Sequence, residues 1–455
     1  MKQRLTVGVF SILSIILFLF VSPVFSLAFS GGDGSPGNPY QIQYLSELQS
    51  VGGHVDKHFL LMNNIDASDT LFWNDGKGFL PIFNFSGSFN GQGFEIGGLY
   101  INRPNIPNCV GLFTTLQSGA QVTNLKLVSG SVTGYSSVGF LVGTNHGGRI
   151  SNCNATGRVS GHDRVGGLVG SMSAGSVKTS HSTGDVDGDT NFVGGLVGQI
   201  LGGTLNKNYA TGKVIGGGNS VGGLVGVNNG VIDNCFSIGN VNGTSSVGGL
   251  VGYNNSDGIV RYCYTISGIV QGTNKLGGLV GDNFEGEIIN SFSFCEARGD
   301  FDIGGLVGSN RYGSVKRSYA RGKVLAIDPE FPAPEYDYIG GLVGNNSGDV
   351  MECYATGYIY TYVLSHEEAI GGLVGYNTGT VSMSYWDKQS TGRTTSQGSV
   401  PSFGKNTAQM KQQATFVGWD FARTWSIQET LAYPFLLARQ STAFLPAIHL
   451  LLLGE

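Results

Sequence analysis

The sequence has little charge, few cysteines and almost no long apolar runs, and each shortage excludes a class of protein. Lys, Arg, Asp and Glu make up 13% of the 455 residues, about half the usual share. The net charge of −5 is small, so no nucleic-acid partner is expected. Six cysteines are too few for a scaffold held together by disulfides. We therefore expect a chain that satisfies its backbone polar groups internally and presents a polar, largely uncharged surface.

Only the first residues form an apolar stretch long enough to direct the chain to a membrane. Lys2 and Arg4 precede the run LTVGVFSILSIILFLFV, and FSLA ends at residue 28 with small side chains. This order is typical of a secretory signal peptide, with an uncleaved anchor helix as the alternative. The apolar tail 442–455 is too short to span a bilayer, and we interpret it as a packing strand or, alternatively, a sorting signal. The sequence thus predicts a secreted or cell-surface protein with no membrane span once residues 1–28 are cleaved.

Glycine is abundant instead, with 75 residues, more than twice its usual share. Many of these glycines stand in one recurring phrase, and from Val138 to Ile303 successive copies begin 26 to 29 residues apart. A fixed period of this length is the signature of a solenoid. The phrase reads VGGLVG, LGGLVG or IGGLVG at 165–170, 193–198, 221–226, 247–252, 276–281, 303–308, 339–344 and 370–375.

Each copy also has a second half, such as RISNCNATGRVSG at 149–161. Turn residues fall three times per copy, and the short runs between them are rich in β-branched and aromatic side chains. No 3.6-residue periodicity occurs in this zone, so helices are not expected there. Three short strands and three turns in each copy predict one coil of a right-handed parallel β-helix. The all-β rod would have about ten coils, spaced ~4.8 Å apart.

In such a stack the same position of every coil lies over its neighbour, so recurring apolar letters become interior columns. Each buried aliphatic side chain contributes ~1.5–3 kcal/mol of transfer free energy. The paired glycines, such as Gly166 and Gly167, either adopt positive φ or allow backbone to pack where a Cβ would clash. One column comprises Leu168, Leu196, Leu224, Leu250, Leu279, Leu306, Leu342 and Leu373. A second comprises Val159, Val186, Val214, Val241, Val270, Val324 and Ile359.

Two further columns are polar or sulfur-bearing. Cys153, Cys235, Cys263 and Cys353 fall at matching places and suggest a buried column of small thiols, with a Cys235–Cys263 bridge as the alternative. Two residues beyond each phrase stands an asparagine, interrupted by Met172 and Ile200. Stacked asparagines pass amide hydrogen bonds from coil to coil, which favours a structural ladder over a polar binding strip. The ladder comprises Asn145, Asn228, Asn254, Asn283, Asn310, Asn346 and Asn377.

The GGLVG repeats at this spacing resemble the GLUG-motif repeat family of exported bacterial proteins. The flanks are similar to that family too, with GDGSPGNPYQIQYLSELQSV before the repeats and SYWDKQSTGRTTS after them. The family includes adhesin-like surface proteins and accessory regions of some immunoglobulin A-specific peptidases. The resemblance therefore implies an exported surface protein and says very little about a biochemical activity.

A solenoid needs atypical ends, because exposed edge strands invite edge-to-edge pairing. SELQSV has a short helical pattern that would begin an N-terminal cap, and TAQMKQQATFVGWDF resembles an amphipathic helix with Met410 and Phe416 inward. The predicted division of the chain is a signal peptide at 1–28, an N-terminal cap with first coils at 29–100, the GLUG-repeat β-helix at 101–386, a capping segment at 387–441 and the tail at 442–455.

No catalytic residue, cofactor or metal site is predicted. HEEAI at 366–370 begins like a zinc-peptidase helix, but Ile370 stands where the second histidine is required. None of the seven histidines has a convincing triad context. The rival interpretation is a polysaccharide lyase or glycoside hydrolase that uses carboxylates on the outer face of neighbouring coils. Its candidate residues are Asp185, Asp187, Asp189, Arg298, Asp300, Asp302, Arg311, Lys316, Arg317, Arg321 and Lys323.

Two enlarged connections are the better candidate for binding. The segments at 326–338 and 358–369 lengthen successive coils at the same expected corner, so they would be neighbours in space. Aromatics beside carboxylates suit sugar stacking, protein contact or calcium, whereas the alternative is an insertion packed on itself. LFWNDGKGF at 71–79 is a second, weaker spot. The predicted binding residues are Phe331, Tyr336, Tyr338, Tyr360, Tyr362, Asp328, Glu330, Glu335, Asp337, Glu367 and Glu368.

Together these patterns favour a non-catalytic, adhesin-like surface scaffold. Its expected partner is an extracellular glycan or a surface protein. The sequence does not fix an oligomeric state.

Overall fold

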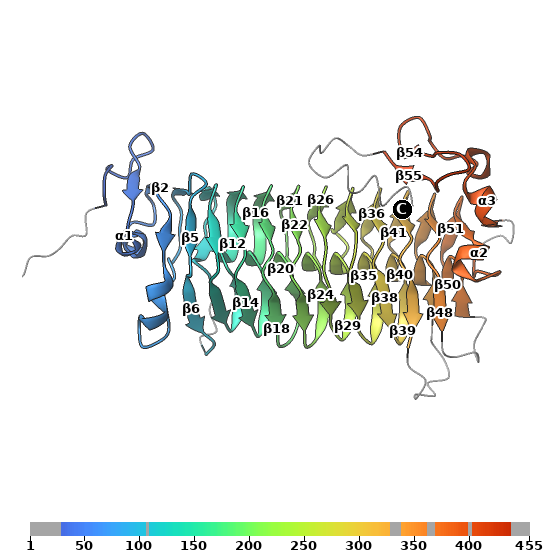
Figure 1. Cartoon of the computed structure of the whole chain (residues 1–455), viewed down its shortest axis with the longest axis horizontal. Helices are drawn as coiled ribbons and strands as arrows, with labels where there is room; N and C mark the ends of the chain where they lie inside the picture. Colours follow the sequence, from blue (N-terminus) through green and yellow to red (C-terminus); the bar gives the residue numbers. More distant parts are fainter. Residues whose placement is uncertain (1–28, 106–108, 328–337, 362–368, 399–402, 438–455) are drawn as a thin grey trace, which may run out of the picture.

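The computed structural model describes residues 29–105, 109–327, 338–361, 369–398 and 403–437. These residues form a parallel β-solenoid of about eleven turns, which confirms the predicted fold class. Figure 1 shows a straight rod in which coils follow one another in sequence order, with small helical elements at both ends. Every strand pairing between coils is parallel, so each coil repeats the path of the one before it.

A coil contains five short strands in four sheets, not the three strands that the sequence predicted. The coil from Val197 to Gly222 shows the pattern with β20, β21, β22, β23 and β24. The turn residues counted in the sequence did not reveal two of the corners of each coil. The chain bends at the glycine pair of the repeat phrase, and it turns again at a left-handed residue such as Lys207, with φ of 56°.

The first and largest sheet has 21 strands and receives two strands from most coils. The strands that follow the repeat phrase are β7 (Phe113–Leu116), β12 (Val142–Ser151), β16 (Val169–Lys178), β20 (Val197–Ile200), β25 (Val225–Asn228), β30 (Val251–Asn254), β35 (Val280–Phe284), β40 (Val307–Arg311), β45 (Val343–Asn346) and β50 (Val374–Asn377). The others are β1 (Tyr40–Ile42), β2 (His58–Leu61), β4 (Ser88–Asn90), β8 (Gln121–Thr123), β21 (Thr204–Asn206), β26 (Val231–Asp233), β31 (Ile259–Arg261), β36 (Glu287–Ile289), β41 (Ser314–Lys316), β46 (Asp349–Met351) and β51 (Thr380–Ser382).

The second sheet has 13 strands, most of them only two residues long. In each strand one side chain enters the core and the other faces outward, as Ala210 and Tyr209 do in β22. Its strands are β3 (Ile65–Asp66), β5 (Glu95–Gly97), β9 (Lys126–Val128), β13 (Asn154–Ala155), β17 (His181–Ser182), β22 (Tyr209–Ala210), β27 (Phe236–Ser237), β32 (Tyr264–Thr265), β37 (Phe292–Ser293), β42 (Tyr319–Ala320), β47 (Tyr354–Ala355), β52 (Tyr385–Asp387) and β53 (Gly404–Lys405).

The third and fourth sheets complete each coil, with ten and nine strands. The third sheet comprises β6 (Tyr100–Arg103), β10 (Ser131–Gly134), β14 (Arg158–Gly161), β18 (Val186–Gly188), β23 (Val214–Gly216), β28 (Val241–Asn242), β33 (Ile269–Gln271), β38 (Glu296–Gly299), β43 (Val324–Ala326) and β48 (Ile359–Thr361). The fourth comprises β11 (Ser136–Gly139), β15 (Asp163–Gly166), β19 (Val193–Gly194), β24 (Asn219–Gly222), β29 (Ser245–Gly248), β34 (Asn274–Gly277), β39 (Phe301–Gly304), β44 (Ile339–Gly340) and β49 (Ile370–Gly371).

The interior columns lie where the repeat predicts them. All eight leucines of the repeat phrase, from Leu168 to Leu373, have no solvent-exposed surface. The valine column is buried as well, and Val159, Val186 and Val214 are direct partners on successive strands. Side chains of one column therefore cover one another along the rod, and a single core runs through the described coils.

The glycine pair of the phrase is required by close packing of backbone. A Cβ on Gly166 would lie 2.1 Å from the carbonyl oxygen of Val169, and one on Gly167 would lie 2.3 Å from that of Gly195. Neither glycine has positive φ. Of the two explanations open at the sequence level, the steric one is correct, because these corners leave no room for a side chain.

The cysteines are all free thiols, and Cys235 and Cys263 do not form a bridge. Cys153, Cys235, Cys263 and Cys353 are fully buried in one column, as predicted. Small polar residues occupy the same place on the intervening coils. For example, the backbone N–H of Cys153 donates to Ser180 Oγ at 3.0 Å. Burial raises the pKa of the Cys153 thiol to about 12, so this thiol remains protonated at neutral pH.

The N-terminal cap consists of α1 (Leu45–Ser50), η1 (Val51–Gly53) and the first short strands. Glu47 fixes the start of α1, because its carboxylate accepts from the backbone N–H groups of Gln43 and Tyr44 and from Ser30 Oγ. Leu48 and Val51 are fully buried against the first coil. A short helix η2 (Ser68–Phe72) follows within the first coils.

The C-terminal cap is built on α2 (Lys388–Thr391), α3 (Thr407–Met410), η5 (Gln413–Thr415) and the antiparallel pair β54 (Trp425–Ser426) and β55 (Phe435–Leu436). Asp387 and Asn406 cap the two α-helices by accepting from backbone N–H groups. Met410 and Phe416 point inward, as the sequence predicted, although the helix α3 ends at Met410 and is much shorter than expected. Within the described residues, no helix is long and apolar enough to cross a membrane.

Candidate functional site

The two enlarged connections leave and rejoin the rod at one corner. The first runs from the end of β43 to the start of β44, and the second runs from β48 to β49. Since β43 pairs with β48 and β44 pairs with β49, the connections join the same two sheets on successive coils. Their ends are therefore neighbours, as the sequence predicted.

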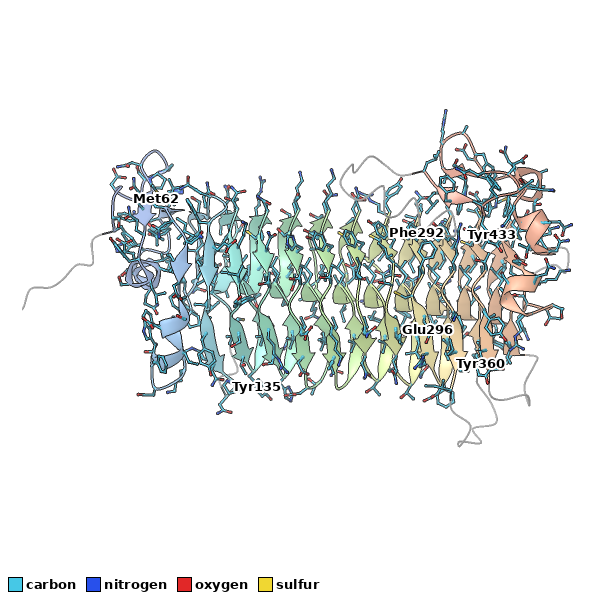
Figure 2. All side chains as sticks on the ribbon, viewed as in Figure 1. Met62, Tyr135, Phe292, Glu296, Tyr360 and Tyr433 are labelled. Carbon is cyan, nitrogen blue, oxygen red and sulfur yellow. The ribbon has the colours of Figure 1, made fainter. Side chains whose placement is uncertain are left out.

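Most of the predicted binding residues lie outside the described residues. They are Asp328, Glu330, Phe331, Glu335, Tyr336, Asp337, Tyr362, Glu367 and Glu368. Of the described pair, Tyr338 stacks on Tyr376 of the next coil, with ring centroids 4.4 Å apart. Tyr360 on β48 is 39% exposed. Figure 2 shows Tyr360 on the opposite side of the rod from Phe292 and Tyr433. Arg393, which follows α2 of the C-terminal cap, donates to Thr361 Oγ1 at 3.2 Å on the same strand. The corner thus has an aromatic rim that lies next to the start of the cap.

The asparagines form a continuous hydrogen-bonded ladder inside the rod. Asn228 Nδ2 donates to Asn254 Oδ1 at 2.8 Å, and the same bond recurs from coil to coil up to Asn377 at 2.6–2.8 Å. Each second amide hydrogen is donated to a backbone carbonyl in the same turn, such as that of Gly286 from Asn283. From Asn228 to Asn346 the side chains have no exposed surface. Their hydrogen-bonding capacity is therefore used within the rod.

Two apolar residues interrupt this ladder. Met172 and Ile200 occupy the asparagine position of their coils, and both are fully buried. Asn145 lies beyond them, and among the described residues its side-chain amide bonds within its own turn, to Gly147 and Gly148. The position is thus an interior site that accepts either a paired amide or an apolar side chain.

The charges proposed for a carbohydrate-active enzyme are mostly scattered. Asp187 pairs with Arg158 at 3.1 Å, and Asp185 accepts from the backbone of Lys213. Arg298 pairs with Glu296 at 2.6 Å. These are exposed or half-exposed pairs between neighbours, and each contributes ~0–1 kcal/mol to stability.

One compact group of charges stands apart, and we call Lys275, Asp282, Asp302 and Arg311 the Asp282 cluster. It lies where the fourth sheet meets the first, beside the glycine corner. The Asp282 side chain is 2% exposed and accepts from Lys275 Nζ at 2.9 Å and from Arg311 at 2.7 and 3.0 Å. Arg311 also covers the ring of Phe284, 4.8 Å from its centroid. The sequence had named Asp302 and Arg311, but not Lys275 or Asp282.

Asp302 is the unusual member of this cluster. Burial raises its pKa to about 7, although Lys275 and a hydrogen bond with Asn345 act in the opposite direction. Asp282, on the neighbouring coil, accepts hydrogen bonds from the two cations Lys275 and Arg311. Ser309 Oγ, between Asp282 and Asn345 in register, is buried without a partner among the described residues. An acid and a carboxylate on neighbouring coils are the elements of general acid–base chemistry.

An outward-facing aromatic ladder on the second sheet was not predicted. Successive rings are nearly parallel, with centroids 4.4–5.2 Å apart. The C-terminal cap covers its last members, where Trp425 lies 6.1 Å from both Tyr319 and Tyr354. The signal was present, because an aromatic or histidine recurs one residue before the inward Ala, Ser or Thr. The ladder comprises His181, Tyr209, Phe236, Tyr264, Phe292, Tyr319 and Tyr354.

Arg321 joins the cap to this ladder. Its guanidinium donates to Tyr354 Oη at 2.7 and 3.0 Å and to the carbonyl of Pro434 at 3.1 Å. It also lies 5.1 Å from the ring centroid of Tyr319 and 5.4 Å from that of Tyr433. Arg321, which the sequence placed among the enzyme candidates, is therefore a structural residue that fixes the cap.

Comparison with known proteins gives a motif and partial relatives. The GLUG motif matches residues 134–160 and 336–360. A stretch of 131 residues, 28% of this chain, is 44% identical to Halomucin of Haloquadratum walsbyi, and covers 1% of that protein. A stretch of 131 residues, 27% of this chain, is 35% identical to a "Putative Gly-rich membrane protein" of Evansella cellulosilytica, and covers 15% of it. The chain thus spans only a small part of either relative.

One solved structure is similar over most of its length. It is the crystal structure described as a "putative immunoglobulin A1 protease" from Bacteroides ovatus. The match covers 90% of this chain and 95% of that one, with 16% identity and a TM-score of 0.37. At this degree of similarity neither fold nor function is transferred from it.

Proposed function

We propose that this chain, which carries the GLUG motif in two regions, is a non-catalytic rod that is displayed at the cell surface or secreted. The relatives support a surface location through their names, since one is called a mucin and the other a membrane protein. The predicted signal peptide is consistent with export. The rod would present a binding corner to an extracellular glycan or a surface protein.

The observation that carries this proposal is the aromatic rim at the corner of the enlarged connections. Tyr338 and Tyr376 stack, and Tyr360 is 39% exposed on β48, the strand from which the second enlarged connection leaves. Aromatic faces next to carboxylate-rich connections suit sugars or a protein loop. Calcium is the ion that such carboxylates would bind. The rigid stack behind the corner would hold it in place without a change of shape.

A glycan and protein array tests this proposal directly. We expect the purified chain to bind a subset of probes and Tyr360→Ala to weaken that binding at least fivefold, because one stacking face is removed. Tyr312→Ala is the matched control, since Tyr312 is 72% exposed and belongs to a different part of the coil. Equal loss in both variants, or no binding to any probe, would contradict the proposal. Repeating the array with a chelator tests the calcium expectation.

The Asp282 cluster supports a second candidate, a carbohydrate-active enzyme. Asp302, whose pKa burial raises to about 7, lies in a cluster with a second carboxyl group, Asp282, and two carboxyl groups are what such an enzyme requires. Reducing-sugar release from common polysaccharides, measured on the same preparation, separates the two functions. Release that disappears in Asp302→Asn would favour the enzyme, whereas binding without release favours the rod.

A further inference from the structure

The N-terminal cap contains a cavity that neither candidate function uses. Its volume is about 500 Å³, within the range of small-molecule sites. The elements that line it, such as β6, lie at the opposite end of the rod from the C-terminal cap (Figure 1), and the cavity is therefore far along the stack from the Asp282 cluster. Its walls include Leu80, Pro81, Phe83, Arg103, Cys109 and Val110.

The fold brings three separate segments to this cavity. The end of η1 supplies one wall through Gly52 and Gly53, and the residues that follow the 71–79 segment supply the apolar wall. Arg103 stands at the end of β6, where that strand leaves its pairing with Gly134. At the mouth, Leu80 is 56% exposed and Phe83 is 65% exposed. Such exposure of large apolar side chains at a cavity marks a surface that binds something.

Arg103 gives the cavity its chemistry, because it is the charged residue among those that line it. Its Nη2 donates to the carbonyl oxygen of Phe79 at 3.3 Å, but its Nε is buried and has no hydrogen-bond partner in the described part of the chain. Burial lowers the pKa of the guanidinium, although an arginine stays protonated in proteins. Among the described residues, no carboxylate forms an ion pair with it.

A partly buried guanidinium that no carboxylate of the described residues neutralises is a candidate partner for an anion from outside. The fork of a guanidinium matches a carboxylate, and a single arginine neutralises a single negative charge. The leucine, proline, phenylalanine and valine side chains of the surrounding wall carry no charge. They would instead cover an apolar body attached to the anion.

We propose that this cavity binds a small monocarboxylate with an apolar body, such as a medium-chain fatty acid or an arylalkanoic acid. The carboxylate accepts hydrogen bonds from the terminal nitrogens of the Arg103 guanidinium. The apolar body lies against Leu80, Pro81, Phe83 and Val110.

Cys109 supplies a reporter inside the same cavity. It is half-buried, whereas the other five cysteines are buried, so it is the thiol that an added reagent reaches in the folded chain. Its Sγ lies 3.0 Å from Thr144 Oγ1. A ligand that fills the cavity will therefore slow the reaction of Cys109 with a maleimide.

The experiment titrates the full chain with octanoate and 3-phenylpropionate by calorimetry and follows maleimide labelling in parallel. We expect saturable binding with one site per chain and slower labelling of Cys109. Octan-1-ol and inorganic phosphate are the controls, because one lacks the charge and the other lacks the apolar body. Binding of octan-1-ol as tight as that of octanoate, or no binding of either carboxylate at 10 mM, would overturn the proposal.

Substitution of the arginine separates a specific site from an apolar surface. Arg103→Gln should weaken octanoate binding by roughly tenfold to a hundredfold, the range for loss of a charge-assisted hydrogen bond, and should abolish the protection of Cys109. Arg149→Gln, which removes an exposed arginine of β12, should change neither. Circular dichroism and the urea midpoint show whether Arg103→Gln remains folded. A folded Arg103→Gln variant that keeps the original affinity would overturn the assignment.

Discussion

At the scale of residues, the rod is held by side chains that are repeated in register. From Asn228 to Asn377 each asparagine bonds to the asparagine of the next coil, and the leucines of the phrase likewise lie over one another. The sequence predicts these columns well, since identical letters recur at a fixed period. It predicts the Asp282 cluster poorly, because Lys275, Asp282 and Asp302 occupy positions whose letters vary from coil to coil. Partners across a corner cannot be identified by periodicity alone.

Asn283 tests the interior ladder. Asn283→Ala removes the bonds that join Asn254 and Asn310 and leaves buried amide groups unpaired, so we expect a loss of ~2–4 kcal/mol in unfolding free energy. Chemical denaturation in urea measures it. Asn377→Ala, at the half-buried end of the ladder, is the control and should cost less. A change below about 0.5 kcal/mol at Asn283 would show that the ladder contributes little.

Asp302 predicts a specific pH dependence. Its folded pKa of about 7 lies above the ordinary value of 3.8, so its stabilising contribution is complete below pH 4. That contribution is lost as pH rises through 7, because the folded state then holds a buried carboxylate. Asp302→Asn should therefore be more stable than the parent above pH 7, by ~1–3 kcal/mol, and similar to it near pH 4.

Thermal or urea unfolding at pH 4, 6 and 8 measures this difference. Asp257→Asn, at an exposed aspartate, serves as the control and should show no pH-dependent change relative to the parent. If the parent and Asp302→Asn have parallel pH profiles, the carboxyl group of Asp302 does not titrate in this range.

At the scale of elements, the short strands are determined by packing, and the corners by sterics. The five-strand coil was not predicted, because the glycine pair was not recognised as a corner of the coil. The chain bends there, and a Cβ on Gly166 or Gly167 would lie 2.1–2.3 Å from a carbonyl oxygen. The aromatic ladder was missed for a different reason. His181, Tyr209 and Phe236 differ in letter, although all present a flat ring at the same place. The cap was predicted in outline, but its attachment through Arg321 depends on contacts between residues more than a hundred positions apart.

Trp425 tests how firmly the C-terminal cap is attached. Its ring is fully buried between Tyr319, Tyr354 and Trp419, and truncation to alanine typically costs ~3–5 kcal/mol. We expect Trp425→Ala to speed proteolysis and amide exchange within 407–436 at least tenfold while the central coils stay protected. Val417→Ala, at a residue that is 73% exposed, should leave both unchanged. Uniform exchange through the whole chain would mean that cap and coils unfold together.

At the scale of the whole molecule, the repeat makes coils interchangeable. Ser220 and Ser246 both precede a VGGLVG phrase, and both have positive φ, 62° and 52°. Val193 pairs with Val221 as Val221 pairs with Val247. Even the interior ladder tolerates the junction, because Ile200 already lies next to an asparagine on the following coil. The period in the sequence is therefore a structural unit that can be removed as a whole.

Deletion of residues 221–246 tests this interchangeability. It joins Ser220 to Val247 and removes one coil without changing the register of the others. We expect a folded rod that is shorter by ~4.8 Å in small-angle X-ray scattering. Deletion of 221–233 removes half a coil and should abolish the folded state, because every later column would shift out of register. Two deletions of equal effect would contradict the modular arrangement.

The two caps have a consequence for how such a molecule can be lengthened. In the described residues, short helices lie at both ends of the rod, and we expect them to hinder the addition of another copy to either end. The length of one rod would then follow from the number of repeats that the chain encodes and would not depend on concentration. A gene that gains or loses one repeat would change the length of the rod by the spacing of one coil.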